Sequence, residues 1–480
     1  MILDRIADRT RQRLVAQRAA QPLDQLRRQA EALGPGRGAD FERALAGGGL
    51  SFICEVKRAS PSKGLIAPDF DPVQIARRYA AGGASAISVL TEPEFFLGSD
   101  QDLAQVAAAV TTPTLRKDFV VDPYQIYQAR TLGAAAVLLI CRLLSGAQLA
   151  EWLALADSLG LAALVETHDQ AEVDQALAAG AKVVGVNNRD LATFQVDLAW
   201  TERLAPAIPD QVTLVAESGV HGPDDVERLR RAGVDAVLVG ERLMRAPDQA
   251  RALDQLRRRL PRIKLCGLSR TQDVAAANRA RPDYVGFVFA PSRRQVSPAQ
   301  ARDLRAGLAP GIAAVGVFVD AAEADILDLT GAGVIDWIQL HGHESPAQVE
   351  RLRQASGRPV IKAVPSLDPA DPAWAAAAAA DAVLLDAGAG SGRRLDWSRL
   401  PVSEQPWFLA GGIGLDNLDQ ALALPGWPVL DLSSGAETSG LKDPAKMIEL
   451  TARTHAWGHP RLARRARSAV APDVVERQSP

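Results

Sequence analysis

Short apolar runs recur along the whole chain, and longer stretches rich in Ala, Leu and Arg separate them. This alternation is typical of buried parallel strands joined by crossover helices. The first half of the chain holds eight such runs, at 52–56, 86–90, 114–117, 136–140, 163–166, 183–186, 213–217 and 236–239. The second half holds eight more, at 263–266, 284–289, 313–319, 337–340, 360–364, 383–386, 407–410 and 429–432. We therefore predict two sets of eight parallel strands.

Eight parallel strands that alternate with helices close into a (β/α)8 barrel of roughly 250 residues, or roughly 200 at the small end of the range. The 480 residues exceed what one hydrophobic core usually supports, so two domains are expected. The predicted fold class is α/β, with two tandem (β/α)8 TIM barrels.

Changes in composition predict the domain boundaries. An Arg-rich segment ends at Pro261, just before a new apolar run, and beyond 456 basic and polar residues replace the apolar periodicity. We predict an N-terminal helical extension of the first barrel at 1–47, a first barrel at 48–256, a second barrel at 262–456 and a mobile tail at 457–480. The amphipathic extension is expected to cap a barrel mouth.

Small residues follow the last two strands of each set. Gly219 and Gly240 are 240 − 219 = 21 residues apart, and Gly412 and Ser433 are 433 − 412 = 21 residues apart. Backbone N–H groups at two neighbouring strand ends can converge on one anion. The pattern predicts two phosphate sites, which also include Ser218, Gly411 and Ser434.

Composition narrows the possible partners. Hydrophobic residues make up 47% of the chain and charged residues 23%, as in ordinary globular proteins, and the net charge of −3 gives no reason to expect nucleic acid. Three scattered cysteines favour a reducing compartment, and no apolar run approaches the roughly 20 residues that span a membrane. We expect a cytoplasmic protein that binds neither membrane nor nucleic acid.

Five strand ends of the first half carry charged residues. They are Glu55 and Lys57, Lys117, Glu166, Arg189 (which follows the amide Asn187), and Glu217. Active sites of such barrels lie at the carboxyl ends of the strands. A single charged residue there is more often half of a structural ion pair, but five strand ends together favour catalysis. Lysine and glutamate in one partly dry pocket are suited to proton transfer.

These residues lie in segments that resemble indole-3-glycerol phosphate synthase. The matching segments are FICEVKRASPSKG at 52–64, LRKDF at 115–119, LVE at 164–166 and GVNNRDL at 185–191, and the resemblance spans residues 1–255. It implies ring closure of 1-(2-carboxyphenylamino)-1-deoxyribulose 5-phosphate to indole-3-glycerol phosphate, with loss of CO2 and water.

The resemblance also implies roles for single residues. Lys117 is the implied general acid of ring closure, while Glu166 and Lys57 handle the later protons in an order that the sequence leaves open. The implied substrate-binding residues are Glu55, Phe119, Asn187, Arg189, Glu217 and Ser218, and those that hold the phosphate are Ser60, Gly219 and Gly240.

A different pair stands at strand ends of the second half. Cys266 ends a strand and is followed by Gly, whereas Asp386 ends another strand beside a glycine-rich segment. A thiolate and a carboxylic acid across one pocket can remove one proton and supply another without metal or cofactor. By contrast, Cys54 and Cys141 are interpreted as small buried hydrophobes.

The second half resembles phosphoribosylanthranilate isomerase over residues 262–454. The matching segments include KLCG at 264–267, SRR at 292–294, QLHG at 339–342 and DLSSG at 431–435. The resemblance implies an Amadori rearrangement in which Asp386 protonates the ribose ring oxygen and Cys266 removes the C2 proton. Arg294 is implied to bind the anthranilate carboxylate. The other implied substrate contacts are Gln339 and His341, and Gly411, Gly412, Ser433 and Ser434 at the phosphate.

Several alternatives remain at this point. His341 and His343 suggest a metal site, but no further His or Cys stands at ligand spacing, so we predict no metal and no cofactor. One barrel alone could be catalytic, with the other a phosphate-binding scaffold. A phosphosugar isomerase of another pathway would need paired Asp residues where Cys266 and Val364 stand. The preferred hypothesis is a monomeric, bifunctional enzyme of tryptophan biosynthesis acting on phosphorylated small molecules.

Overall fold

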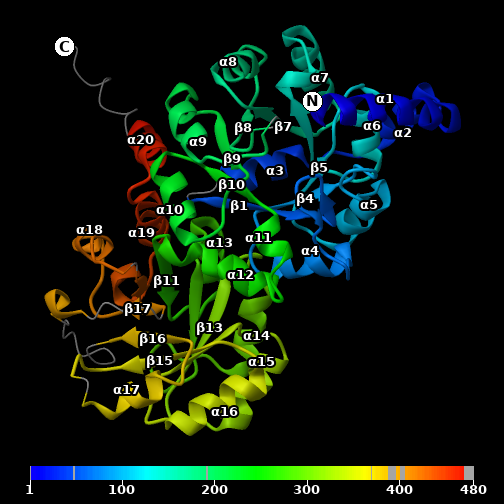
Figure 1. Ribbon diagram of the computed structural model, residues 1–480. Helices are drawn as coiled ribbons and strands as arrows, with labels where there is room; N and C mark the ends of the chain where they lie inside the picture. Colours follow the sequence, from blue (N-terminus) through cyan, green and yellow to red (C-terminus); the bar gives the residue numbers. More distant parts are fainter. Residues whose placement is uncertain are drawn as a thin grey trace, which may run out of the picture. The chain divides into compact units, whose positions relative to one another are not determined.

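The computed structural model describes residues 2–46, 49–190, 193–368, 370–386, 396–400, 406–426 and 428–469. The chain divides into two compact units. The first contains Met1–Arg257 and Gly458–Pro480, and the second contains Arg258–Trp457. Figure 1 labels the helices and strands of both units.

The first unit is a closed barrel of eight parallel strands in the order β1-β4-β5-β6-β7-β8-β9-β10, with β10 paired to β1. The strands are β1 (Ser51–Val56), β4 (Ala86–Leu90), β5 (Thr114–Lys117), β6 (Ala136–Ile140), β7 (Ala162–Thr167), β8 (Val183–Asn187), β9 (Thr213–Glu217) and β10 (Ala236–Val239). The helices that follow them are α4 (Pro72–Ala81), α5 (Asp100–Ala109), α6 (Tyr124–Thr131), η1 (Cys141–Leu143), α7 (Gly146–Ser158), α8 (Gln170–Ala178), α9 (Ala199–Leu204), η2 (Ala205–Ala207), α10 (Pro223–Arg231), α11 (Glu241–Met244) and α12 (Gln249–Leu256).

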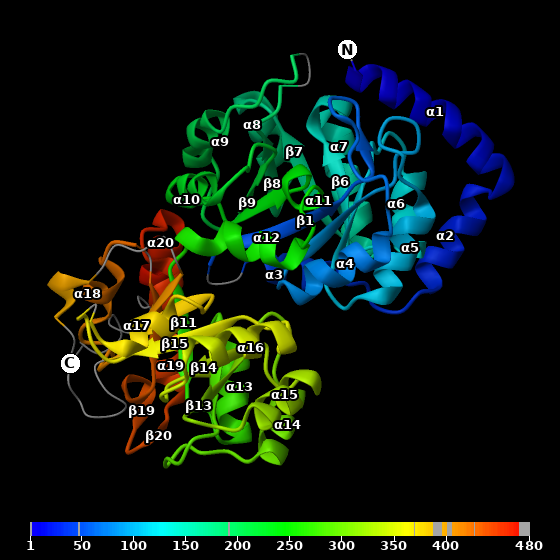
Figure 2. The ribbon, with the colours of Figure 1, turned by 60° about the horizontal axis from the view of Figure 1, so that its bottom comes forward.

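The N-terminal extension consists of three helices, α1 (Ile2–Ala20), α2 (Leu23–Ala32) and α3 (Gly38–Leu45). Figure 2 shows α2 running along the outside of the barrel beside α5 and α6. Leu14 and Leu26 pack there against Tyr124 of α6. Because Phe41 and Leu45 of α3 are fully buried with the interior residues of the strands, the third helix contributes to the barrel core.

The second unit is another closed parallel barrel, in the order β11 to β18 with β18 paired to β11. Its strands are β11 (Arg262–Cys266), β12 (Tyr284–Val288), β13 (Ala313–Phe318), β14 (Trp337–Leu340), β15 (Val360–Val364), β16 (Ala382–Leu385), β17 (Trp407–Leu409) and β18 (Val429–Leu432). The helices are α13 (Thr271–Ala280), α14 (Pro298–Ala306), α15 (Glu323–Gly331), α16 (Pro346–Ser356), α17 (Pro372–Ala377), η4 (Trp397–Arg399), α18 (Leu418–Leu422), η5 (Ser434–Ala436) and α19 (Pro444–Ala456). The prediction of two tandem (β/α)8 barrels is confirmed.

Two small hairpins were not predicted. One joins β2 (Ala59–Ser60) to β3 (Gly64–Leu65) in the loop after β1, and the other joins β19 (Glu437–Thr438) to β20 (Leu441–Lys442) after β18. Both follow a strand at its carboxyl end, so they are part of the loops that carry the candidate sites. Within the described residues, none of the helices is both long enough and apolar enough to cross a bilayer.

The prediction of a mobile tail is wrong for its first part. Residues Pro460–Ala469 form helix α20, and Figures 1 and 2 both show it beside α10 of the first unit. Arg461 is only 2% exposed and donates to the carbonyls of Ile208 and Pro209, each at 2.9 Å. The basic residues that suggested a solvated tail therefore bind the first barrel. Residues 470–480 lie outside the described residues.

Candidate active sites

The centre of the first site is Lys117, the last residue of β5. Its Nζ donates to Glu166 Oε2 at 2.9 Å and to Glu217 Oε2 at 2.8 Å. Glu166 and Glu217 come from β7 and β9, and both carboxylates are almost completely buried. Parallel strands end at the same rim, so residues far apart in sequence meet here. Asn187 Nδ2 of β8 donates to Glu166 Oε1 at 3.2 Å.

The two carboxylates that share Lys117 have different pKa values, because burial dominates at one and nearby positive charges dominate at the other. Burial raises the pKa of Glu217 to about 7, and the nearby charge of Lys117 opposes this rise. Burial also acts on Glu166, but the charges of Lys117 and His168 outweigh it and lower the pKa to about 2. The pKa of Lys117 is raised above its ordinary value, because the two carboxylates outweigh burial. The site thus holds a firmly ionised carboxylate next to one that titrates near neutrality, an arrangement suited to acid–base chemistry.

A second lysine lies on the same rim. Lys57, directly after β1, pairs with Glu55 of that strand. Gly240, at the end of β10, faces this pair, since a Cβ atom there would collide with the Glu55 carboxylate and would lie 3.1 Å from Lys57 Nζ. Gly219 has a φ of +93°, which a side chain would strain. Glycine is therefore favoured at Gly219 by its backbone conformation, and a side chain at Gly240 would displace the Glu55 carboxylate.

A cavity of about 180 Å³ opens at this rim. All the residues predicted for the first site line it, namely Glu55, Lys57, Ser60, Lys117, Phe119, Glu166, Asn187, Arg189, Glu217, Ser218, Gly219 and Gly240. The structure thus brings together residues spread over 186 positions of sequence, from 55 to 240 inclusive. Ile2, Leu3 and Ile6 of α1 also line the cavity, so the extension does lie at the barrel mouth.

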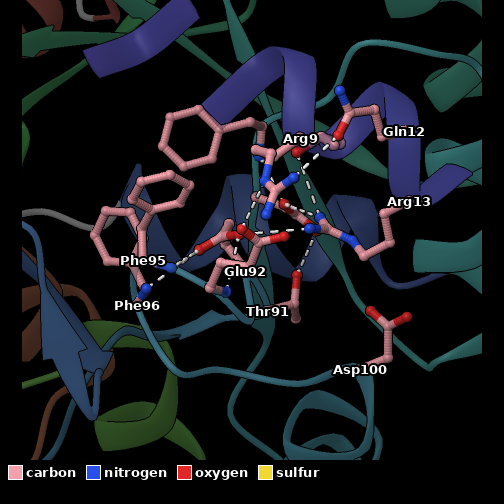
Figure 3. Close-up of polar contacts among 12 residues, drawn as sticks. Arg9, Gln12, Arg13, Thr91, Glu92, Phe95, Phe96 and Asp100 are labelled. Atoms are coloured by element: carbon pink, nitrogen blue, oxygen red, sulfur yellow. Dashed lines mark hydrogen bonds and ion pairs between the residues drawn. The ribbon is translucent and has the colours of Figure 1, made fainter. Parts of the chain in front are cut away.

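The sequence reasoning did not identify Phe96, which also lines the cavity and whose ring lies 5.9 Å from that of Phe119. Figure 3 shows how its loop is held: the buried Glu92 carboxylate accepts backbone N–H groups of Phe95 at 2.6 Å and Phe96 at 3.2 Å. Arg13 of α1 donates to Glu92 at 3.4 Å. The sequence feature that could have predicted this contact is the adjacent pair Phe95 and Phe96 shortly after the end of β4.

The second site begins at Cys266, the last residue of β11, which is partly exposed. Lys264 of the same strand is fully buried and donates to Asp431 Oδ2 at 2.7 Å. Burial raises the pKa of the Cys266 thiol, and the Lys264 charge opposes that rise. The sulfur lies against Gly286 of β12, where a Cβ atom would be 2.6 Å from it. The thiol is therefore held at the rim, next to a buried cation.

Two predicted contacts of the second site lie on β14 and just after it. Gln339 Nε2 and His341 Nε2 lie 2.5 Å apart. Burial, with the charges of Lys264 and Lys362, lowers the pKa of His341 to about 3. The imidazole is neutral near pH 7, so His341 can contribute a hydrogen bond but no positive charge.

Arg294 is held by a carboxylate of the chain. Its Nε and Nη2 donate to the two oxygens of Glu437 at 2.7 Å and 3.1 Å, and Lys442 donates to Glu437 at 2.9 Å. Arg293 binds the same carboxylate at 2.7 Å. Sequence reasoning did not find Glu437, because it lies in the unpredicted hairpin after β18.

The remaining predicted residues lie at neighbouring strand ends. Asp386 follows β16, is partly exposed, and donates its backbone N–H to Val364 at 3.2 Å. Gly411 and Gly412 follow β17 with φ angles of +103° and +67°. Ser433 follows β18 and donates its hydroxyl to the Cys266 carbonyl at 3.2 Å, and Ser434 begins η5. Part of the glycine-rich segment after Asp386, residues 387–395, lies outside the described residues.

The two histidines considered as metal ligands contact different residues. His341 lies beside Gln339, whereas His343 Nδ1 lies 3.0 Å from Asp320. In the part of the chain that the structure describes, no group of three or more His, Cys, Asp or Glu side chains is arranged to hold a metal ion.

Comparison with known families matches each barrel separately. The family model described as indole-3-glycerol phosphate synthase matches residues 3–256. The family model described as N-(5'phosphoribosyl)anthranilate (PRA) isomerase matches residues 263–453.

Individual relatives match one barrel or both. An indole-3-glycerol phosphate synthase of Ruminiclostridium cellulolyticum is 50% identical over 54% of this chain and 99% of its own length. The tryptophan biosynthesis protein TrpCF of Yersinia pestis is 39% identical over 85% of both chains, and that of Salmonella typhi is 41% identical over 84% of this chain and 88% of its own. A phosphoribosyl anthranilate isomerase structure from Thermus thermophilus covers 41% of this chain and 99% of its own, at 37% identity and a TM-score of 0.36.

Proposed function

Because the chain belongs to the bifunctional family that joins indole-3-glycerol phosphate synthase to phosphoribosylanthranilate isomerase, we propose that the strand-end residues of its two barrels carry those two reactions. The C-terminal barrel converts N-(5-phosphoribosyl)anthranilate to 1-(2-carboxyphenylamino)-1-deoxyribulose 5-phosphate. The N-terminal barrel converts that product to indole-3-glycerol phosphate.

In the synthase barrel, Lys117 acts as general acid. The aromatic carbon that bears the carboxylate attacks the ribulose carbonyl, and the Lys117 ammonium donates a proton to the oxygen as negative charge develops there. Loss of CO2 then restores the aromatic ring. This role is supported by the position of Lys117 Nζ between Glu166 and Glu217, which keeps the amine protonated.

Dehydration completes the reaction. The ionised Glu166 takes a proton from the cyclised intermediate while Lys57 donates one to the departing hydroxyl, which leaves as water. The low pKa of Glu166 and the place of Lys57 beside Glu55 support this division of the protons, which the sequence left open. Glu55, Phe119, Asn187, Arg189 and Glu217 bind the substrate, while Ser60, Ser218, Gly219 and Gly240 hold its phosphate.

In the isomerase barrel, Asp386 protonates the ribose ring oxygen, and the C1–O bond breaks as the anilino nitrogen forms an imine. Cys266 then removes the proton from C2, and the resulting enolamine tautomerises to the ketone. Lys264 supports this step because its buried charge favours the thiolate.

Binding of the isomerase substrate uses the surrounding strand ends. Two nitrogens of Arg294 are occupied by Glu437, so the anthranilate carboxylate binds at Nη1. Gln339 and His341 contact the sugar, and Gly411, Gly412, Ser433 and Ser434 hold the phosphate. We further propose that the protein acts in the cytoplasm as a monomer, without metal, cofactor or nucleic acid.

The observation that carries the proposal is the Lys117, Glu166 and Glu217 cluster inside a cavity lined by every predicted synthase residue. The test assays each reaction from its own substrate. Lys117→Ala should lower synthase turnover by roughly 10²-fold or more and leave isomerisation unchanged. Full synthase activity in this variant would remove Lys117 from the mechanism.

A further inference from the structure

His168 is a buried histidine next to the synthase site that the proposed mechanism does not use. It directly follows β7, two residues after Glu166, and its side chain is 7% exposed. A buried imidazole needs partners for both ring nitrogens, because an unsatisfied buried polar atom is costly. The contacts of the two nitrogens therefore indicate what this residue does.

The first ring nitrogen is fixed by helix α8. His168 Nδ1 lies 3.0 Å from Glu172 Oε2, and the same oxygen accepts the His168 backbone N–H at 2.8 Å. Arg142 of η1 donates to the other oxygen of Glu172 at 2.9 Å. Because an ionised carboxylate only accepts hydrogen bonds, Nδ1 carries a proton.

The second ring nitrogen faces the catalytic carboxylate. His168 Nε2 lies 3.5 Å from Glu166 Oε1, and among the described residues it has no hydrogen-bond partner. A neutral imidazole with its proton on Nδ1 would direct the Nε2 lone pair toward a negative carboxylate. A proton on Nε2 turns this repulsion into an attraction.

The charged groups around the ring favour that proton. Glu166 of β7 and Glu172 of α8 flank the imidazole, Asp169 precedes α8, and Arg142 of η1 is the nearby positive charge. Cys141 of η1 stays a neutral thiol, since burial raises its pKa to about 12. Burial alone would lower the pKa of His168, but the hydrogen bond to Glu172 and the charges of Glu166 and Glu172 outweigh burial and raise it.

We propose that His168 is a positioning residue of the synthase, whose imidazolium, anchored by Glu172, orients the Glu166 carboxylate and keeps it ionised for proton transfer. The inference rests on the proposed role of Glu166. It adds a cation on the side of Glu166 away from Lys117, because Lys117 binds Oε2 and His168 faces Oε1.

The test is the pH profile of synthase turnover in His168→Gln, which keeps a hydrogen-bond donor but cannot carry charge. We expect turnover to fall about tenfold on the acidic side of neutrality, the effect of losing about 1.4 kcal/mol of charge attraction between His168 and Glu166. The deficit should shrink as pH rises above the His168 pKa, where the wild-type imidazole is also neutral. The acidic limb should move to higher pH, since Glu166 loses a cation. A deficit that is the same at every pH would show a merely structural role and overturn the proposal.

A second measurement does not depend on activity. Imidazole titration by NMR should give His168, identified by its loss in His168→Gln, a pKa above its ordinary value that drops in Glu166→Gln. A pKa that does not respond to Glu166→Gln would overturn the pairing. His343→Gln is the matched control, because His343 is exposed and lies in the other unit. Absence of synthase activity in the wild type would instead contradict the proposed function, which separates the two failures.

Discussion

Two carboxylates that share one lysine have opposite acid–base character in this protein. The charges of Lys117 and His168 keep Glu166 ionised. Burial instead raises the pKa of Glu217 to about 7, so Glu217 is partly protonated near neutral pH. The strands impose this asymmetry, because His168 follows the strand of Glu166 and lies beside Glu166 rather than Glu217.

The stability of the first barrel should depend on pH because the pKa of Glu217 is raised. The folded chain binds this proton more tightly than the unfolded chain, whose Glu pKa is 4.5, against about 7 when folded. The stabilising contribution of this proton to the free energy of unfolding is complete below pH 4.5, and it is lost as the pH rises to about 7. Glu217→Gln cannot ionise, so its melting temperature should rise relative to wild type across this window. Glu166, with its pKa of about 2, changes the stability only below pH 4.5, so it does not affect the comparison in this window. A constant difference in melting temperature would contradict the assignment.

Cys266→Ser should depress isomerase turnover strongly, because a hydroxyl has a far higher pKa than a thiol and does not form the anionic base that removes the C2 proton. Since burial raises the thiol pKa, alkylation of Cys266 should accelerate with pH, and substrate should protect against it. Cys54 and Cys141 are buried, with pKa values raised to about 12, and serve as internal controls. Isomerase activity that survives both the substitution and alkylation would refute the thiolate mechanism.

The sequence was sufficient to predict residues that end apolar strands, such as Lys117 and Glu217, because strand periodicity places them on one rim. It was not sufficient for His168 or Glu437, which lie in loops. Their roles depend on which side chains the loops bring within a few ångströms, and apolar periodicity carries no information on that. Phe96 belongs to the same class, since the buried Glu92 fixes its loop.

At the scale of elements, helix α20 is a structural part of the first barrel. Arg465 pairs at 2.9 Å with Asp235, which precedes β10 and is only 3% exposed, and Arg461 lies 3.4 Å from the same carboxylate. Arg464 pairs at 2.8 Å with Asp210. Loss of α20 would remove these ion pairs together with the buried side chain of Arg461 and its hydrogen bonds to the first barrel.

Truncation after Trp457 should therefore destabilise the first barrel by about 2 kcal/mol or more, because hydrogen bonds of charged groups such as those of Arg461 contribute about 1.5–3 kcal/mol each. Thermal unfolding monitored through synthase activity measures this change. Truncation after Ala469 is the matched control, because it retains α20 and should unfold like the full chain. Equal melting temperatures for both truncations would mean that α20 contributes nothing.

The strands could be predicted because each is a short, wholly buried apolar run, as in β6, where all five residues are buried. Helix α20 could not, since its contacts with the barrel come from arginines that in sequence are indistinguishable from a solvated basic tail. Asp210 and Asp235, the acidic partners that distinguish the two cases, lie more than 200 residues earlier. Long-range charge pairing of this kind leaves no periodic signal.

At the scale of the whole molecule, each unit has its own hydrophobic core and its own candidate site. A fragment of residues 258–457 should therefore fold and isomerise unaided, with turnover close to that of the full chain. A fragment of residues 1–257 lacks α20 and should be less stable than the same barrel in the full chain. Inactivity of several second-unit fragments with nearby start points would contradict the independence of the units.

The central claim is that one chain performs two consecutive reactions at two sites. The most direct measurement gives N-(5-phosphoribosyl)anthranilate to the purified full-length chain and follows both products over time. The wild type should form 1-(2-carboxyphenylamino)-1-deoxyribulose 5-phosphate and then indole-3-glycerol phosphate. Lys117→Ala should accumulate the first product alone, and Cys266→Ser should form neither unless supplied with the first product. Indole-3-glycerol phosphate from Lys117→Ala at the wild-type rate, or a wild type that stops at the first product, would contradict the account.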